Sequence, residues 1–149
     1  MPGQTRHHRK FYVATLSILL GLFCFRVLAQ LLQRYVEVPF LPPFDVWQSG
    51  AVPYSALFAS QILIIAFYGW ILRNIVTNRM QPSRRQGRVF FIIGLIYFFV
   101  MVARLFIGVT GLSENHWFRS YLPTLFHFVL SGYLIVVGNF HLQATVRRP

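Results

Sequence analysis

Acidic residues are scarce in this chain of 149 residues, which has three Asp and Glu against 14 Lys and Arg. Only 11% of its residues are charged, whereas an average soluble domain has about 25%. Its single cysteine, Cys24, excludes a disulfide within one chain and a zinc site built on cysteines. An HExxH sequence, a Gly-rich phosphate loop and paired carboxylates are also missing. The sequence therefore predicts no catalytic residue and no metal site.

The chain has long apolar runs instead. It is 56% apolar and 17% aromatic, and the apolar residues gather in four runs at about 11–33, 54–76, 89–112 and 121–142. Each run is long enough to cross a hydrocarbon core, which takes about 20 residues. None has the charged outer face of a helix in a soluble bundle. The sequence predicts an all-α integral membrane protein, a four-transmembrane-helix bundle forming a single membrane domain over residues 1–149.

The distribution of charge predicts the topology. All three acids lie in the segments 34–53 and 113–120, which together hold only two arginines. Nine of the remaining basic side chains precede the first run, lie in the segment 77–88 or end the chain: Arg6, Arg9, Lys10, Arg79, Arg84, Arg85, Arg88, Arg147 and Arg148. By the positive-inside rule, both termini are expected in the cytoplasm of a plasma membrane or bacterial inner membrane. No folded basic domain remains outside the membrane, which argues against a nucleic-acid partner.

The connection at 34–53 is rich in proline, with Pro39, Pro42, Pro43 and Pro53. Because proline removes a backbone donor and breaks helices, we expect a stiff, extended cap on the outer mouth of the bundle. The segments FCFRVLAQLL and FVMVARLFIG resemble each other, which raises the alternative of two repeated hairpins. Small residues four apart, Ser17 with Gly21 and Ala56 with Ser60, are predicted to let helices pack closely.

Each predicted span carries one strongly polar side chain at a similar depth: Arg26, Gln61, Arg104 and His127. At about 1.5 Å rise per residue they lie roughly 9–12 Å below the outer interface. Gln30 shares the helical face of Arg26. A charge facing lipid would cost about 3 kcal/mol or more, so we expect both arginines to face the interior.

The four runs contain no acid to neutralise these arginines. Asp45 and Glu114, from the outer loops, are predicted as internal ion-pair partners. Alternatively the counter-charge is an anion from outside the chain, because a guanidinium matches phosphate or carboxylate; a third source is an acid on another subunit. On the second hypothesis the ligand-binding residues are Arg26, Gln30, Gln61, Arg104 and His127.

Two histidines of the last run, His127 and His141, are 14 residues apart and share a helical face at about 21 Å separation. A span with two such histidines is similar to the haem-carrying spans of the cytochrome b family. The resemblance covers one span of four and implies haem b held by His127 and His141. Because the first three runs contain no histidine, a dimer or another subunit would have to supply the opposite ligands.

Three functions are compatible with these features. The first is a non-enzymatic binding or accessory protein whose outer-side polar pocket takes an anionic amphiphile such as a membrane lipid. Such a protein would act alone, as a homodimer or as a small subunit of a larger membrane complex. The second is a haem b electron-transfer protein. The third is a membrane enzyme acting on a lipid head group with His127 as base. The identity of any cofactor stays open.

Overall fold

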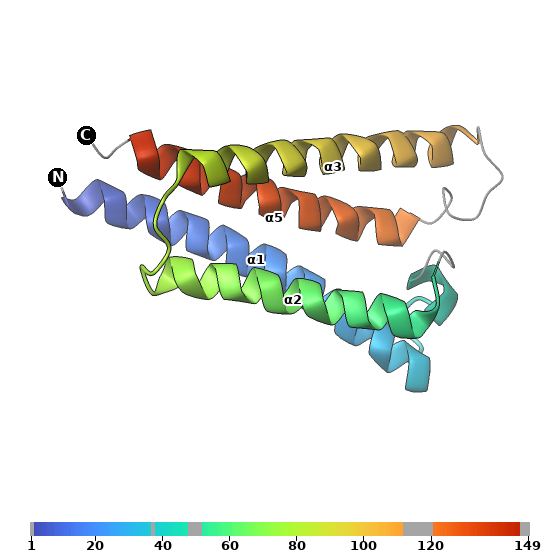
Figure 1. Cartoon of the computed structure of the whole chain (residues 1–149). Coiled ribbons are helices and arrows are strands. Elements are labelled where there is room, and N and C mark those ends of the chain that lie inside the picture. Colours follow the sequence, from blue (N-terminus) through green and yellow to red (C-terminus); the bar gives the residue numbers. More distant parts are fainter. Residues whose placement is uncertain (1, 37, 48–51, 112–120, 147–149) are drawn as a thin grey trace.

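The computed structural model describes residues 2–36, 38–47, 52–111 and 121–146. Helix α1 runs over Pro2–Tyr35, and the short 3-10 helix η1 over Phe44–Trp47. Helices α2, α3 and α5 run over Tyr54–Val76, Arg84–Thr110 and Tyr121–Val146. These described parts contain helices and no strand (Figure 1).

Four helices are long and apolar enough to cross a membrane, as the four runs predict. Helix α2 covers the same residues as the predicted second run. Helix α3 starts earlier than predicted, at Arg84, because the Ser83 hydroxyl caps it by accepting from the Gln86 N–H at 3.5 Å. It ends at Thr110, and the next residue, Gly111, has a φ of 68°, which suits glycine after a helix end.

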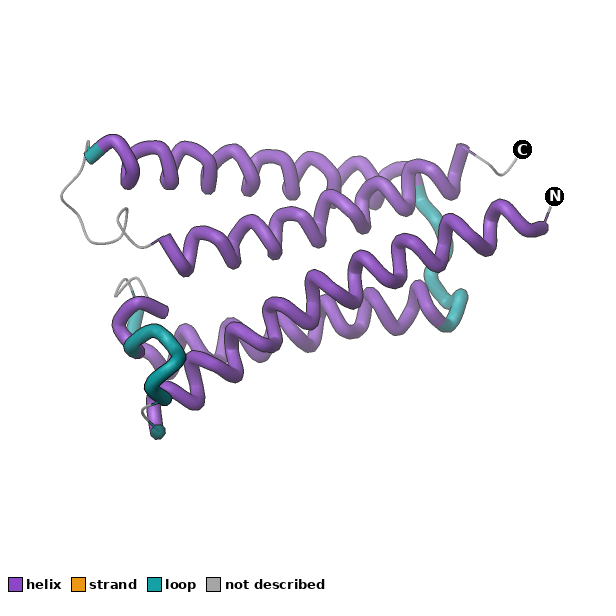
Figure 2. Tube along the Cα trace, turned by 180° about the vertical axis from the view of Figure 1, so that it is seen from behind, coloured by secondary structure: helices purple, strands orange, loops and turns teal. Residues whose placement is uncertain are grey.

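The helices form two hairpins. Helices α3 and α5 pack most closely, and α1 packs against both α5 and α2. In the described part of the chain, α2 and α3 do not approach each other closely. The beginning of α1, the end of α5 and the α2–α3 connection lie at one end of the molecule, and η1 lies at the other (Figures 1 and 2). Helix α5 therefore joins the two hairpins.

Glycines set the distance between α3 and α5. A Cβ added at Gly138 would lie 2.6 Å from the Phe91 backbone nitrogen, and one at Gly94 would lie 2.9 Å from the Ile135 nitrogen. Such approaches are open only to a residue without a side chain. The predicted close-packing pairs are wrong for contacts within the chain, because Ser17, Gly21, Ala56 and Ser60 are all exposed.

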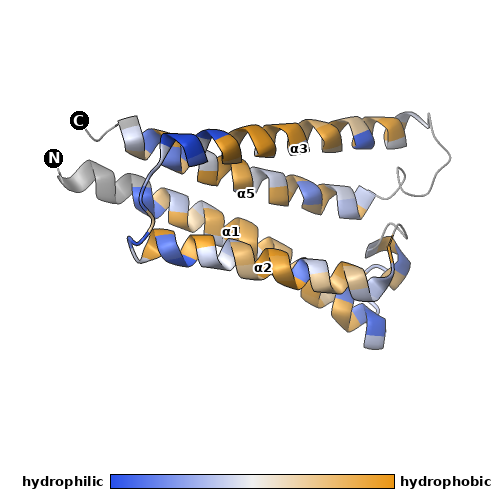
Figure 3. Cartoon of the chain, viewed as in Figure 1, coloured by the Kyte–Doolittle hydropathy of each residue, from blue (hydrophilic) through white to orange (hydrophobic). Residues whose placement is uncertain are grey.

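Two tyrosines tie α2 to α5 in the apolar core. The rings of Tyr68 and Tyr133 stack with centroids 4.1 Å apart. The Tyr68 hydroxyl donates to the Leu130 carbonyl at 3.0 Å, and the Tyr133 hydroxyl donates to the Tyr68 carbonyl at 2.8 Å. Hydrophobic residues predominate along the middle of the helices, and hydrophilic residues gather at the α2–α3 connection (Figure 3). This is the pattern expected of helices that face lipid.

Candidate polar binding layer

The two predicted arginines are buried. Arg26 on α1 is 6% exposed and Arg104 on α3 is 3% exposed. Both lie near enough to Tyr97 and His127 to interact with them electrostatically. Side chains from α1, α3 and α5 therefore meet in one layer, as the depth of each residue in its run predicts.

Helix α2 joins this layer through a pair of amides. The Gln61 Nε2 donates to the Gln30 Oε1 at 3.0 Å. These side chains are 2% and 0% exposed, respectively. The other polar atom of each side-chain amide, Gln30 Nε2 and Gln61 Oε1, is buried without a hydrogen-bond partner. A donor and an acceptor are thus left unsatisfied inside the layer, a state that costs about 1–3 kcal/mol for each group.

Arg26 is held by the cap. Its Nη2 donates to the Trp47 carbonyl at 2.9 Å, and its guanidinium carbon lies 5.5 Å from the centre of the Phe126 ring. Trp47 is only 3% exposed, stacks on Phe126, and donates from Nε1 to the Pro42 carbonyl at 2.8 Å. Trp47 thus lies against Arg26 and Phe126, and the segment ending there forms a turn of 3-10 helix where an extended segment was expected. The Arg26 Nε is buried and has no partner.

Of the two acids predicted to neutralise the arginines, the structure describes only Asp45. Asp45 lies on η1 and is exposed. Glu114 lies outside the described residues. The contact that the structure gives for Arg26 is the backbone carbonyl of Trp47. Pairing of the arginines with Asp45 or Glu114 stays a prediction.

The two histidines of α5 have different surroundings. His127 shares a hydrogen bond of 2.5 Å between its Nδ1 and the Tyr97 hydroxyl. His141 is fully buried, accepts the Ser83 N–H at 3.2 Å on Nδ1, and lies parallel to the Phe90 ring. His141 thereby fastens the start of α3 to α5. Among the described residues, no group of three or more His, Cys, Asp or Glu could hold a metal ion.

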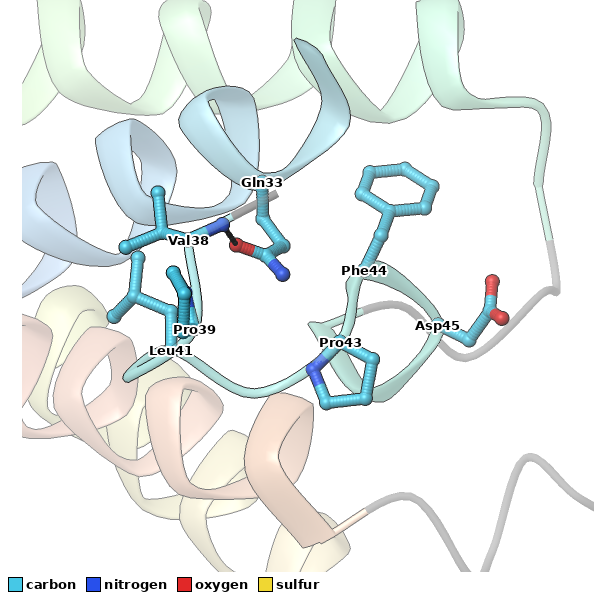
Figure 4. A pocket seen from close by; sticks show the side chains of 7 residues that line it. All are labelled: Gln33, Val38, Pro39, Leu41, Pro43, Phe44 and Asp45. Atoms are coloured by element: carbon cyan, nitrogen blue, oxygen red, sulfur yellow. Dashed lines mark hydrogen bonds between the residues drawn. The ribbon is translucent and has the colours of Figure 1, made fainter. Parts of the chain in front are cut away.

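Sequence reasoning missed a hollow beside the cap. It has a volume of about 570 Å³ and lies between the end of α1, the following loop and η1 (Figure 4). Its lining residues are Gln33, Val38, Pro39, Leu41, Pro43, Phe44 and Asp45. The sequence feature that could have indicated this hollow is the acidic residue Asp45 within a segment rich in proline and aromatic residues.

Within the described part of the layer, the buried donors Arg26 Nε and Gln30 Nε2 are the groups suited to the oxygens of an anion. The chain matches no protein-family model, no curated protein and no solved structure.

Proposed function

We propose that the chain is a non-enzymatic integral membrane protein that holds the anionic group of an amphiphile in the layer of Arg26, Gln30, Gln61, Arg104 and His127. The helices cross a plasma membrane or bacterial inner membrane with both termini in the cytoplasm. The protein acts alone, as a homodimer or as a small accessory subunit of a larger membrane complex. The two hairpins correspond to the two halves of the faint sequence repeat.

The unsatisfied donors around Arg26 carry this proposal. Arg26 Nε and Gln30 Nε2 are buried without partners, and they lie one helical turn apart on α1. Buried polar groups in folded proteins are almost always hydrogen-bonded. Oxygens of a phosphate or carboxylate would satisfy both donors and would also neutralise the guanidinium.

The cap decides how such a ligand reaches the layer. Trp47 covers Arg26 from the outer end and occupies one of its donors with a carbonyl. An anion is a stronger acceptor for a guanidinium than a neutral carbonyl. A ligand head group would therefore take the place of the Trp47 carbonyl, while its apolar tail stays among the lipid-facing side chains.

Native mass spectrometry tests the proposal on the full chain released from its own membrane. We expect a retained anionic amphiphile in the wild-type protein and its loss in Arg26→Gln. Arg73→Gln is the matched control, because Arg73 is an exposed arginine at the far end of α2. A wild-type protein that retains no anionic mass, alone or with other polypeptides, would refute the proposal.

Gln30→Leu tests the contribution of the Gln30 hydrogen-bond donor to ligand binding separately from the charge of Arg26. The variant keeps the guanidinium but removes the unsatisfied Gln30 donor, so we expect weaker retention of the same ligand by about tenfold. Exposed Gln86 on α3 provides a control, because Gln86→Leu should change nothing. The haem and lipid-enzyme alternatives stay predictions; a Soret absorption band in the same preparation would support haem binding.

A further inference from the structure

The hollow beside the cap has the size of a small binding site. Its volume of about 570 Å³ falls within the roughly 300–1,000 Å³ of small-molecule pockets. Five of its seven lining residues are apolar, but more than half of its surface is polar, and Gln33 and Asp45 are its polar side chains (Figure 4). It adjoins the end of α1, and its lining residue Phe44 contacts the Tyr54 ring at the start of α2. In the membrane orientation proposed above, this is the level of the lipid head groups.

Gln33 presents a fixed donor to this hollow. Its Oε1 accepts the Val38 N–H at 3.1 Å, which holds the amide in one orientation. The amide nitrogen then turns toward the space enclosed by the lining residues (Figure 4). An oxygen atom of a ligand would be its natural acceptor.

Asp45 supplies the negative charge at the rim. It is the one acid in the described part of the chain, it is exposed, and the whole chain has a net charge of +11. A cationic group near the outer surface therefore meets repulsion from most of the chain and attraction at this carboxylate. An ionised carboxylate attracts a primary or a quaternary ammonium by its charge, and a primary ammonium also donates hydrogen bonds to it.

Arg34 supplies the opposite charge on the other side of Phe44. Its guanidinium carbon lies 5.1 Å from the centre of the Phe44 ring and 5.4 Å from that of Tyr54. Contact with ring faces holds a guanidinium without using its N–H donors. The side chain is exposed, so its planar fork stays free for a phosphate.

Tyr54 adds a second donor for the same anion. Its hydroxyl is buried without a hydrogen-bond partner and lies near enough to Arg34 to interact with it electrostatically. Tyr54 also begins α2, whose first turn has no side-chain cap. The positive end of a helix favours an anion beside it. Phosphate would therefore meet a guanidinium, a hydroxyl and a helix N-terminus.

We propose that this hollow and the adjoining cluster of Arg34, Phe44 and Tyr54 together bind the zwitterionic head group of a phospholipid, with its ammonium at Asp45 and its phosphate at Arg34 and Tyr54. The Gln33 amide donates to an oxygen of the same head group. The ammonium is either the primary amine of phosphoethanolamine or the quaternary amine of phosphocholine. This site rests on the membrane location proposed above, but it is independent of the layer around Arg26.

The test uses the full chain in nanodiscs with equal parts of phosphatidylethanolamine, phosphatidylcholine and phosphatidylglycerol, followed by native mass spectrometry. In the Arg26→Gln variant, which removes the anion site of the layer, we expect one of the two zwitterionic lipids to be retained in preference to phosphatidylglycerol, and the retained species names the amine. Asp45→Asn should lower that preference about tenfold, as for the loss of one hydrogen bond to a charged group. Arg34→Gln should lower retention of any phospholipid at this site, and Arg73→Gln should leave it unchanged.

Equal retention of the three lipids by Arg26→Gln, which lacks the anion site of the layer, or an unchanged preference when Asp45→Asn is added to it, would overturn the inference. Asp45 and Arg34 are both exposed, so their variants should fold, which circular dichroism checks. Arg26→Gln should leave the zwitterionic lipid bound while it removes the anionic amphiphile. Failure of one site is thereby distinguished from failure of the other.

Discussion

Gly138→Ala probes the closest contact between helices. The new Cβ would lie 2.6 Å from the Phe91 nitrogen and 2.8 Å from both the Cα and the Cβ of Phe91. Comfortable contact between carbon atoms needs about 3.5–4.0 Å. The nitrogen and Cα belong to the backbone of α3, so no change of side-chain rotamer relieves the clash. Helices α3 and α5 must separate by roughly 1 Å to restore that spacing.

Two opposing free-energy terms set the size of the effect. Alanine is favoured over glycine within a helix by up to about 1 kcal/mol. Overpacking a well-packed contact costs about 1–3 kcal/mol, and a clash with backbone lies toward the upper end of that range. We therefore expect Gly138→Ala to lower the free energy of unfolding by about 1–2 kcal/mol.

Gly132→Ala is the matched control. Gly132 lies on the same helix, and a Cβ added there meets nothing within 4 Å. The helix-propensity term should act alone and raise the free energy of unfolding by up to about 1 kcal/mol. The difference between the two variants cancels that term and isolates the packing cost at Gly138.

Reversible unfolding in mixed micelles of mild detergent and increasing dodecyl sulfate measures both variants. Far-UV circular dichroism follows the loss of helix, and intact mass confirms the substitution. Changes for Gly132→Ala and Gly138→Ala of the same sign, within about 0.5 kcal/mol of each other, would refute the reasoning, because independent surface-like substitutions lie within that range. The α3–α5 contact would then be looser than described.

Two further variants follow from single hydrogen bonds and use the same assay. Gln61→Leu should lower the free energy of unfolding by about 1 kcal/mol, because it removes the Gln30–Gln61 hydrogen bond while the stranded Gln30 Oε1 replaces Gln61 Oε1 as the unsatisfied acceptor. The double variant Gln30→Leu/Gln61→Leu should recover part of that loss, and a double variant less stable than Gln61→Leu would contradict this account. Tyr133→Phe should cost about 1 kcal/mol, because its hydroxyl donates to the Tyr68 carbonyl. The control Tyr35→Phe removes an exposed hydroxyl and should leave the free energy of unfolding unchanged. An equal loss of stability in Tyr35→Phe and Tyr133→Phe would exclude a specific role for the Tyr133 hydrogen bond.

The burial of Arg26 and Arg104 could be predicted from the sequence for a physical reason. Lipid penalises an exposed charge so strongly that helical periodicity alone assigns such a residue to the inside. The same argument applies to Gln30 and Gln61, which are also buried. The same argument does not identify the hydrogen-bond acceptor of Arg26, which is the Trp47 carbonyl. Every residue of the cap carries a backbone carbonyl, and nothing in the sequence distinguishes the one at Trp47.

The close packing of α3 and α5 could not be predicted. The chain has ten glycines, and the sequence does not say which of them face a neighbouring helix. Gly21 and Gly69 meet nothing within 4 Å, whereas Gly94 and Gly138 touch the opposite backbone. The difference arises from the rotation of each helix about its axis, which depends on the packing of the whole bundle. Small residues four apart were therefore a poor guide to the contact.

The central position of α5 links the packing to the proposed ligand site. Its Phe126 lies against the Arg26 guanidinium, and its His127 bonds to Tyr97 on α3. Close packing of α5 with α3 and with α1 thus holds the two arginine-bearing helices at a fixed separation. Burial of two guanidinium charges, which are 6% and 3% exposed, opposes that arrangement. An anion in the layer would offset this cost by attraction to the cations, so occupancy should stabilise the fold as well as fill the site. A protein stripped of its amphiphile should consequently unfold at lower dodecyl sulfate than the loaded protein, and Arg26→Gln should abolish that difference.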